Sequence, residues 1–224
     1  MIKIFTRCTL AIVLFATTSF APKEDRPAGI AFKTVTIGAD EWMSENLNVS
    51  HFRNGDPIFE ANTYEEWEYA SIKGLPAWCY YNNNPGYGKK YGKLYNGWAV
   101  RDKRGLGPEG WHVPTDKEWD QLVEDLGGIA EAGGKIRSSD GWDCNTAAND
   151  NGFAALPGGY RTHEMPQYYG GPFYDAGQAG YWWSATGYVV DNIWVRTLSC
   201  KGSGLDKTNF DRTAGMAVRL VKDR

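Results

Sequence analysis

Hard oxygen donors gather in residues 143–150 of this 224-residue chain. Carboxylate and amide oxygens are the groups that calcium prefers, and the ion collects about six to eight of them. The candidate ligands are Asp143, Asn145, Asn149 and Asp150. Their spacing is not that of an EF-hand loop, and Asn and Asp also favour turns for conformational reasons alone. The sequence therefore leaves open a calcium site or an ordinary turn.

Aromatic residues form the second group that could do chemistry. The chain has 10 Trp and 13 Tyr, many of them in its Gly-rich second half. Exposed rings pack on the C–H faces of sugars while neighbouring polar groups bond the hydroxyls, so these residues could form a glycan platform. The candidate ligand-binding residues are Tyr168, Tyr174, Tyr181, Trp182 and Trp183. Alternation along a strand would instead leave one of the two adjacent tryptophans in the core. Tyr160 and Arg161 are expected to be core and internal hydrogen-bond partners.

The sequence contains no recognisable catalytic constellation. His51, His112 and His163 stand far apart and lack metal-binding spacings such as His-Glu-x-x-His. We expect His112 to be a packed, hydrogen-bonded residue. Asp116 and Glu118 could be paired acids, but both fall in the first turn of a predicted helix, where negative charge offsets the macrodipole. No Gly-x-Ser-x-Gly elbow is present. We therefore expect a protein that is not an enzyme.

The start of the chain predicts export. Residues 1–21 have the pattern of a secretory signal peptide, with Lys3 and Arg7 before an apolar run at 10–15. Residues 22–29 read as a flexible leader. Removing the signal takes away two positive charges and moves the formal charge from −3 to −5, which disfavours nucleic acid as a partner. No segment is apolar and long enough for a membrane span. We expect a secreted or surface protein.

Three cysteines follow the predicted signal: Cys79, Cys144 and Cys200. An odd number permits one bridge and one free thiol, and the sequence does not fix the pairing. No pair has the Cys-x-x-Cys spacing of a metal site. We expect cysteines that are buried or singly bridged and carry no chemistry.

Residues 110–119 carry the clearest signal for a structural element. Pro114 holds the residue before it extended, Thr115 is a good N-cap, and Glu118 completes a capping box. Apolar residues then recur at helical spacing until Leu126, and two glycines follow. These features predict a helix over 116–126.

Other elements can be predicted with less detail. Thr63 and Glu66 form a second capping box, which predicts a helix that ends at Gly74. Residues 98–101 could form a short helix or a strand. The predicted strands or extended segments cover 32–37, 41–47, 79–81, 153–156, 181–185, 193–198 and 216–221. This order predicts one loop-rich α+β domain over residues 30–224, with two main helices early and an antiparallel sheet late.

Eight segments carry a family resemblance. They are 34–38 (TVTIG), 42–48 (WMSENLN), 52–58 (FRNGDPI), 91–96 (YGKLYN), 110–119 (GWHVPTDKEW), 155–161 (ALPGGYR), 181–186 (YWWSAT) and 218–223 (VRLVKD). In this order they resemble the Fibrobacter succinogenes major paralogous domain. The resemblance implies an exported or surface protein of Gram-negative bacteria and supplies no activity. Members commonly have Cys where Leu220 stands, so a bridge that ends there is absent from this chain.

A more distant resemblance concerns architecture. Residues 113–119 are similar to the Leu-Pro-Thr-Glu-x-Glu-Trp segment of formylglycine-generating enzymes, and residues 217–221 stand where their Gly-Phe-Arg segment does. This likeness implies a C-type-lectin-like fold. Those enzymes activate oxygen with copper held by two nearby cysteines, a pair that Cys200 alone does not reproduce. We expect a shared fold without a shared function.

These observations favour a non-enzymatic binding or adhesion module for glycans or proteins. The alternatives are an exported enzyme of unknown reaction and a structural subunit of a surface assembly. An aromatic shelf would favour glycan binding, a deep polar pocket would favour an enzyme, and a large exposed apolar patch would favour assembly.

Overall fold

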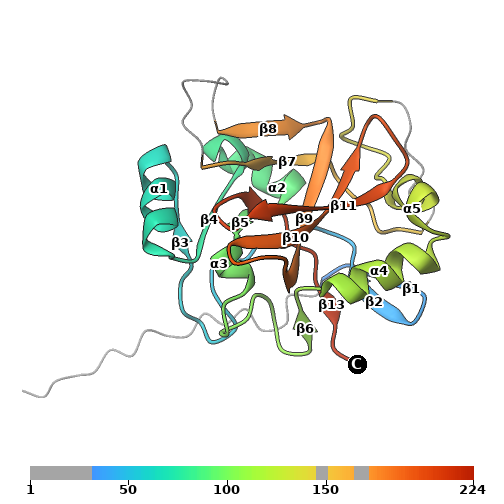
Figure 1. Ribbon diagram of the computed structural model, residues 1–224, viewed down its shortest axis with the longest axis horizontal. Helices are drawn as coiled ribbons and strands as arrows, with labels where there is room; N and C mark the ends of the chain where they lie inside the picture. The colour runs from blue at the N-terminus through green and yellow to red at the C-terminus, as the bar shows by residue number, and fades with distance from the viewer. Residues whose placement is uncertain (1–31, 145–150, 164–171) are drawn as a thin grey trace, which may run out of the picture.

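The computed structural model describes residues 32–144, 151–163 and 172–224. The predicted signal peptide and leader lie outside the described residues. The helices are α1 (Tyr64–Lys73), α2 (Gly88–Tyr91), α3 (Gly97–Val100), α4 (Asp116–Asp125) and α5 (Ile129–Ile136), with 3-10 turns η1 (Tyr81–Asn83) and η2 (Pro85–Tyr87). In Figure 1, α1 lies at one end of the molecule while α4 and α5 lie at the other.

The strands form two sheets. A four-stranded sheet has the order β1-β2-β13-β6, and a nine-stranded sheet has the order β11-β10-β9-β7-β12-β5-β4-β3 with β8 paired to β7. The strand bounds are β1 Thr34–Ile37, β2 Asp40–Met43, β3 Phe59–Glu60, β4 Ala77–Cys79, β5 Leu94–Asn96, β6 Trp111–His112, β7 Gly158–Arg161, β8 Phe173–Ala176, β9 Ala179–Gly187, β10 Asn192–Ser199, β11 Leu205–Asp211, β12 Gly215–Met216 and β13 Val221–Lys222. The α+β class is confirmed. The larger sheet is mixed, however, because β3 pairs with β4 and β7 pairs with β9 in parallel.

Local signals correctly placed the two capped helices. In α4 the Glu118 amide donates to Thr115 Oγ1 at 3.3 Å, and the Thr115 amide donates to Glu118 Oε2 at 2.7 Å. Gly127 and Gly128 follow the helix with φ of 93° and 96°, values that favour glycine. The corresponding capping box starts α1, and Gly74 ends it in the left-handed region.

Near the middle of the chain, one predicted strand is absent and one helix was not predicted. The segment 153–156 is not a strand: it holds one isolated bridge, from Ala155 to Arg137, and strand β7 starts only at Gly158. Its carbonyl groups at Phe153 and Ala154 instead accept hydrogen bonds from Arg219, so they are not available to a ladder. Helix α5 was not predicted, because the glycines that end α4 hide the start of a second helix.

Strand β9 runs through the core with both faces covered. Trp182 and Trp183 point to opposite sides of the strand, and each is fully buried. Trp182 packs in a cluster with Trp42, Trp119 and Phe153, whereas Trp183 belongs to a separate cluster. The strand therefore joins two cores instead of dividing core from solvent.

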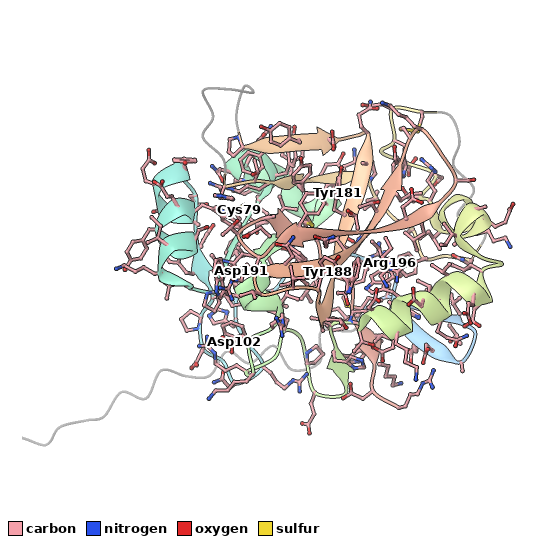
Figure 2. The ribbon with its side chains drawn as sticks, in the orientation of Figure 1. Cys79, Asp102, Tyr181, Tyr188, Asp191 and Arg196 are labelled. Atoms are coloured by element: carbon pink, nitrogen blue, oxygen red, sulfur yellow. A yellow bond between two sulfur atoms is a disulfide. The ribbon has the colours of Figure 1, made fainter. Side chains whose placement is uncertain are left out.

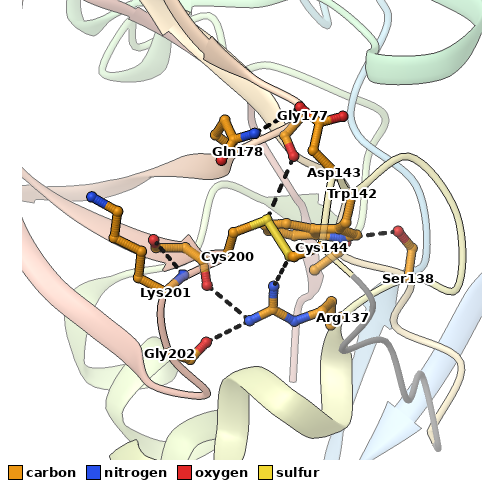
Figure 3. The surroundings of a disulfide bond; sticks show 12 residues. Arg137, Ser138, Trp142, Asp143, Cys144, Gly177, Gln178, Cys200, Lys201 and Gly202 are labelled. Carbon is orange, nitrogen blue, oxygen red and sulfur yellow. Dashed lines mark hydrogen bonds between the residues drawn. A yellow bond between two sulfur atoms is a disulfide. The ribbon is translucent and has the colours of Figure 1, made fainter.

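A disulfide bridge joins Cys144 to Cys200, which are 56 positions apart in sequence, with 5.7 Å between the Cα atoms. Arg137 lies beneath it (Figure 3) and donates to Cys144 Sγ at 3.6 Å and to Ser199 O at 2.9 Å. Cys79 is free and buried, and burial raises the pKa of its thiol to about 11. The structure thus has the one bridge and one free thiol that the cysteine count permits, and a thiol with so high a pKa is a poor nucleophile.

Candidate functional site

The two adjacent tryptophans cannot form an exposed platform. The Trp182 indole nitrogen donates to Asn46 Oδ1 at 2.9 Å, and the Trp183 nitrogen donates to Tyr95 O at 2.7 Å. Neither side chain has any exposed surface. Their assignment as ligand-binding residues was wrong, because layers on both sides of β9 bury both positions of the alternating pair.

Other aromatic residues do line a surface hollow of about 410 Å³, which we call the aromatic recess. Its lining residues are Tyr160, Thr162, His163, Tyr174, Phe210, Asp211, Thr213 and Ala214. They come from β7 and the two residues after it, from β8, and from the end of β11 with the turn that follows it. Tyr174 was predicted as a ligand-binding residue, and the structure places it here. Tyr168 lies outside the described residues.

The rings of the recess are arranged by strand pairing. Tyr160 on β7 lies directly opposite Tyr174 on β8, and their rings stack with centroids 5.4 Å apart. Phe210 meets Tyr160 edge-on at 5.3 Å. Each of these three side chains is partly exposed. The sequence interpretation of Tyr160 as a core residue was therefore incomplete, because the ring both packs inward and lines a hollow.

Tyr181 supports the recess from behind. Its ring lies 4.7 Å from that of Tyr160 and 5.9 Å from that of Phe210, near the centre of Figure 2. Its hydroxyl donates to Asp175 Oδ2 at 2.6 Å. Burial and this carboxylate together raise the pKa of Tyr181 well above its ordinary value. Tyr181 thus fixes the position of two lining rings and is not itself among the lining residues.

A chain of hydrogen bonds crosses the polar side of the recess. The Thr213 hydroxyl donates to Asp211 Oδ1 at 2.7 Å, and the Thr213 amide donates to the same oxygen at 2.8 Å. His163 Nδ1 lies 2.7 Å from the Thr213 hydroxyl. Sequence reasoning missed Phe210, Asp211 and Thr213, because strand β11 shows no clear alternation of apolar and polar residues.

The predicted calcium ligands are largely outside the part of the chain that can be described. Three of them lie outside the described residues: Asn145, Asn149 and Asp150. Asp143 is described, and its Oδ2 accepts from Gln178 Nε2 at 2.7 Å. Among the described residues, no group of three or more His, Cys, Asp or Glu side chains could hold a metal ion. Calcium binding at 143–150 stays a prediction.

The acidic pair at the start of α4 caps the helix and anchors it to the sheet. Asp116 accepts from Arg196 at 2.8 Å and also contacts Lys207. Arg196, on β10, is almost fully buried beside α4 (Figure 2). The capping interpretation is confirmed, and the structure adds the buried arginine that the sequence did not reveal.

His112 is held between two carboxylates. Its Nε2 lies 2.8 Å from Glu118 Oε1, and its Nδ1 lies 2.5 Å from Asp223 Oδ1. The bond to Glu118 raises the pKa of His112, and that to Asp223 adds to the effect against an opposing effect of burial. Burial alone would raise the pKa of Glu118, but bonds from His112 and Thr115 lower it to about 2. Glu118 therefore stays charged while it caps the helix.

This cluster predicts how stability depends on pH. The pKa of His112 is raised in the folded state. The contribution of His112 to the free energy of unfolding is therefore complete below the ordinary histidine pKa of about 6.5, and it is lost as pH rises through the raised pKa. We expect a loss of at most about 1 kcal/mol, since the cluster is partly exposed and screened. Urea unfolding from below about pH 6.5 to above the raised pKa of His112 measures this loss of stability. His112→Gln should flatten the curve and His51→Gln should not; parallel curves for wild type and His112→Gln would contradict the prediction.

An exposed apolar tip lies on the hairpin between β9 and β10. It consists of Tyr188, Val189 and Val190, and Val190 is 90% exposed. The Tyr188 ring packs on Trp194 at 4.3 Å. The tip is one short turn and not a broad apolar face. In the described part of the chain, no helix is long and apolar enough to cross a membrane.

Fold and site together define an α+β domain with one disulfide bridge and an aromatic recess at its surface. A family model described as the Fibrobacter succinogenes major domain matches residues 35–222. The chain belongs to this family, and the resemblance drawn from the eight segments is confirmed. No curated protein matches the chain, and no solved structure matches it.

Proposed function

We propose that this chain is an exported, non-enzymatic binding module whose aromatic recess receives a carbohydrate. The observation that carries the proposal is the convergence of Tyr160, Tyr174 and Phe210 around one open hollow. Aromatic rings with their faces accessible pack on the C–H faces of sugars, and polar groups at the edge then bond hydroxyls. Asp211 and His163 line the same hollow and supply such polar groups.

The size and lining of the recess suit this ligand class. About 410 Å³ lies within the usual range of small-molecule sites, roughly 300–1,000 Å³. The polar groups of the recess bond mainly to one another through Thr213, which holds them in place without a ligand. A site with preset groups loses less entropy on binding than one that must be ordered by its ligand.

Two further features support the proposal. The first and last strands of the described chain meet in one sheet, where β13 pairs with β2, and we propose on this and on the motif resemblance that the fold is C-type-lectin-like. The Cys144–Cys200 bridge suits an oxidising compartment, as expected for an exported protein.

A glycan array on the purified exported form of the chain tests the proposal. We expect hits that Tyr174→Ala and Phe210→Ala each weaken by about tenfold, because each removes one ring face from the recess. Tyr69→Ala is the matched control: Tyr69, on α1, is about half exposed and is not among the lining residues of the recess. Running the array with calcium and with chelator tests the predicted ion site separately. If the folded protein binds no glycan on the array, the carbohydrate proposal is contradicted.

A further inference from the structure

We infer that the carbohydrate bound in the aromatic recess is neutral and that the recess discriminates against acidic sugars. The inference rests on the proposed function and specifies the ligand class of the same site. It follows from the signs of the charges that border the recess. Asp211 lines it. Asp175, which follows Tyr174 in the chain but is not itself a lining residue, accepts a hydrogen bond from the hydroxyl of Tyr181.

The hydrogen-bond chain presents acceptors to a ligand. The Thr213 hydroxyl has a single proton, which it gives to Asp211 Oδ1. It must therefore accept from His163 Nδ1, which fixes the proton on that nitrogen. In the neutral imidazole this leaves Nε2 as an acceptor. A ligand at this edge has to donate hydrogen bonds, as sugar hydroxyls do and carboxylates do not.

The arginines nearest in sequence to the recess are engaged elsewhere. Arg161 follows Tyr160 but is fully buried on the other side of β7, where it donates to Thr63 O at 2.9 Å and stacks on Trp67. Arg212 follows Asp211 but lies over the Trp98 ring and pairs with Asp191 at 2.5 Å. Among the described lining residues, none is Lys or Arg. A sugar carboxylate in the recess would thus face the Asp211 carboxylate, and the described lining residues include no arginine or lysine to compensate.

The test compares sugars that differ only at C6. Glucose and galactose oligosaccharides are titrated against the glucuronate and galacturonate counterparts at low salt. We expect the uronates to bind at least about tenfold more weakly, because carboxylates at short range repel. Asp211→Asn should narrow the ratio of neutral-sugar to uronate affinity, because it removes the negative charge while Asn keeps an Oδ1 that accepts from Thr213. Asp206→Asn, at an exposed site on the same strand, should leave the ratio as it is.

The outcomes separate the inference from the proposal beneath it. Uronates that bind as tightly as the neutral sugars, or a ratio that Asp211→Asn does not change, would overturn the inference and leave carbohydrate binding standing. Absence of binding in both series, together with a blank array, would overturn the proposed function and this inference with it.

Discussion

Arg219→Met is expected to lower the free energy of unfolding by roughly 4 kcal/mol or more, a large share of what holds a domain of this kind together. Arg219 is fully buried. Its guanidinium donates to Asn46 Oδ1 at 2.8 Å and to the carbonyls of Met43, Phe153 and Ala154 at 2.9, 2.7 and 2.9 Å. The side chain thereby ties the C-terminal segment to β2 and to the loop before β7.

The size of the effect follows from the acceptors left behind. Each buried acceptor that loses its donor costs about 1–3 kcal/mol. Methionine removes this donor from the carbonyls of Met43, Phe153 and Ala154, whereas Asn46 Oδ1 keeps the bond from Trp182. Burial lowers the pKa of Arg219 to about 9, which is still high enough to keep it charged at neutral pH. The charge is dispersed over carbonyl and amide oxygens and the face of the Phe153 ring, 4.5 Å away.

Urea denaturation of two further variants controls the experiment. Arg219→Lys should be destabilised too, because an ammonium group cannot reproduce the planar fork that reaches four acceptors. Arg224→Met makes the same replacement at an arginine whose side chain is 69% exposed and pairs with Asp40. We expect it to cost less than about 1 kcal/mol. If Arg219→Met and Arg224→Met cost the same, the buried network does not stabilise the fold as described.

Trp182→Ala is expected to cost about 3–5 kcal/mol, through the cavity it leaves in the core. The indole is fully buried in the same cluster as Trp42 and Trp119, and its nitrogen donates to the same Asn46 oxygen that accepts from Arg219. We therefore expect the variant to be less stable because of this cavity, and not because a ligand contact is lost. Circular dichroism with urea unfolding measures this.

Trp194→Ala is the matched control for that replacement. Trp194 lies on β10 and is only partly buried, against Tyr188 and Lys207. We expect a smaller cost, since its neighbours and solvent can fill the space. A Trp182→Ala protein as stable as Trp194→Ala would contradict the burial that removes Trp182 from the candidate site.

Local patterns predicted the elements whose signals lie within a few residues of each other. The capping boxes at Thr63 and Thr115 and the glycines after α1 and α4 predicted helix bounds to within a residue or two. The strands β9 and β10 were also predicted, although each is longer than its predicted core. The segment at 153–156 failed because its hydrogen-bonding partner, Arg219, lies far away in sequence.

The recess depends on contacts that no local pattern contains. Tyr160 and Tyr174 are on paired strands. Phe210 on β11 contacts Tyr160, and Thr213 in the turn after β11 contacts His163, each about fifty residues further along the chain. The aromatic content of the second half pointed to the right region. It did not distinguish Trp182, which is buried, from Tyr174, which is partly exposed.

The sequence by itself determined the family, the α+β class, the capped helices and the expectation of a single bridge, because each follows from short motifs or from a count. Only the tertiary structure decided which aromatic rings face solvent and which cysteine stays free. It also decided where the buried arginines find their acceptors. These properties are set by which segments pack on each face of a strand. Both faces of β9 are covered by packed segments, so the candidate site lies instead on β7, β8 and the end of β11.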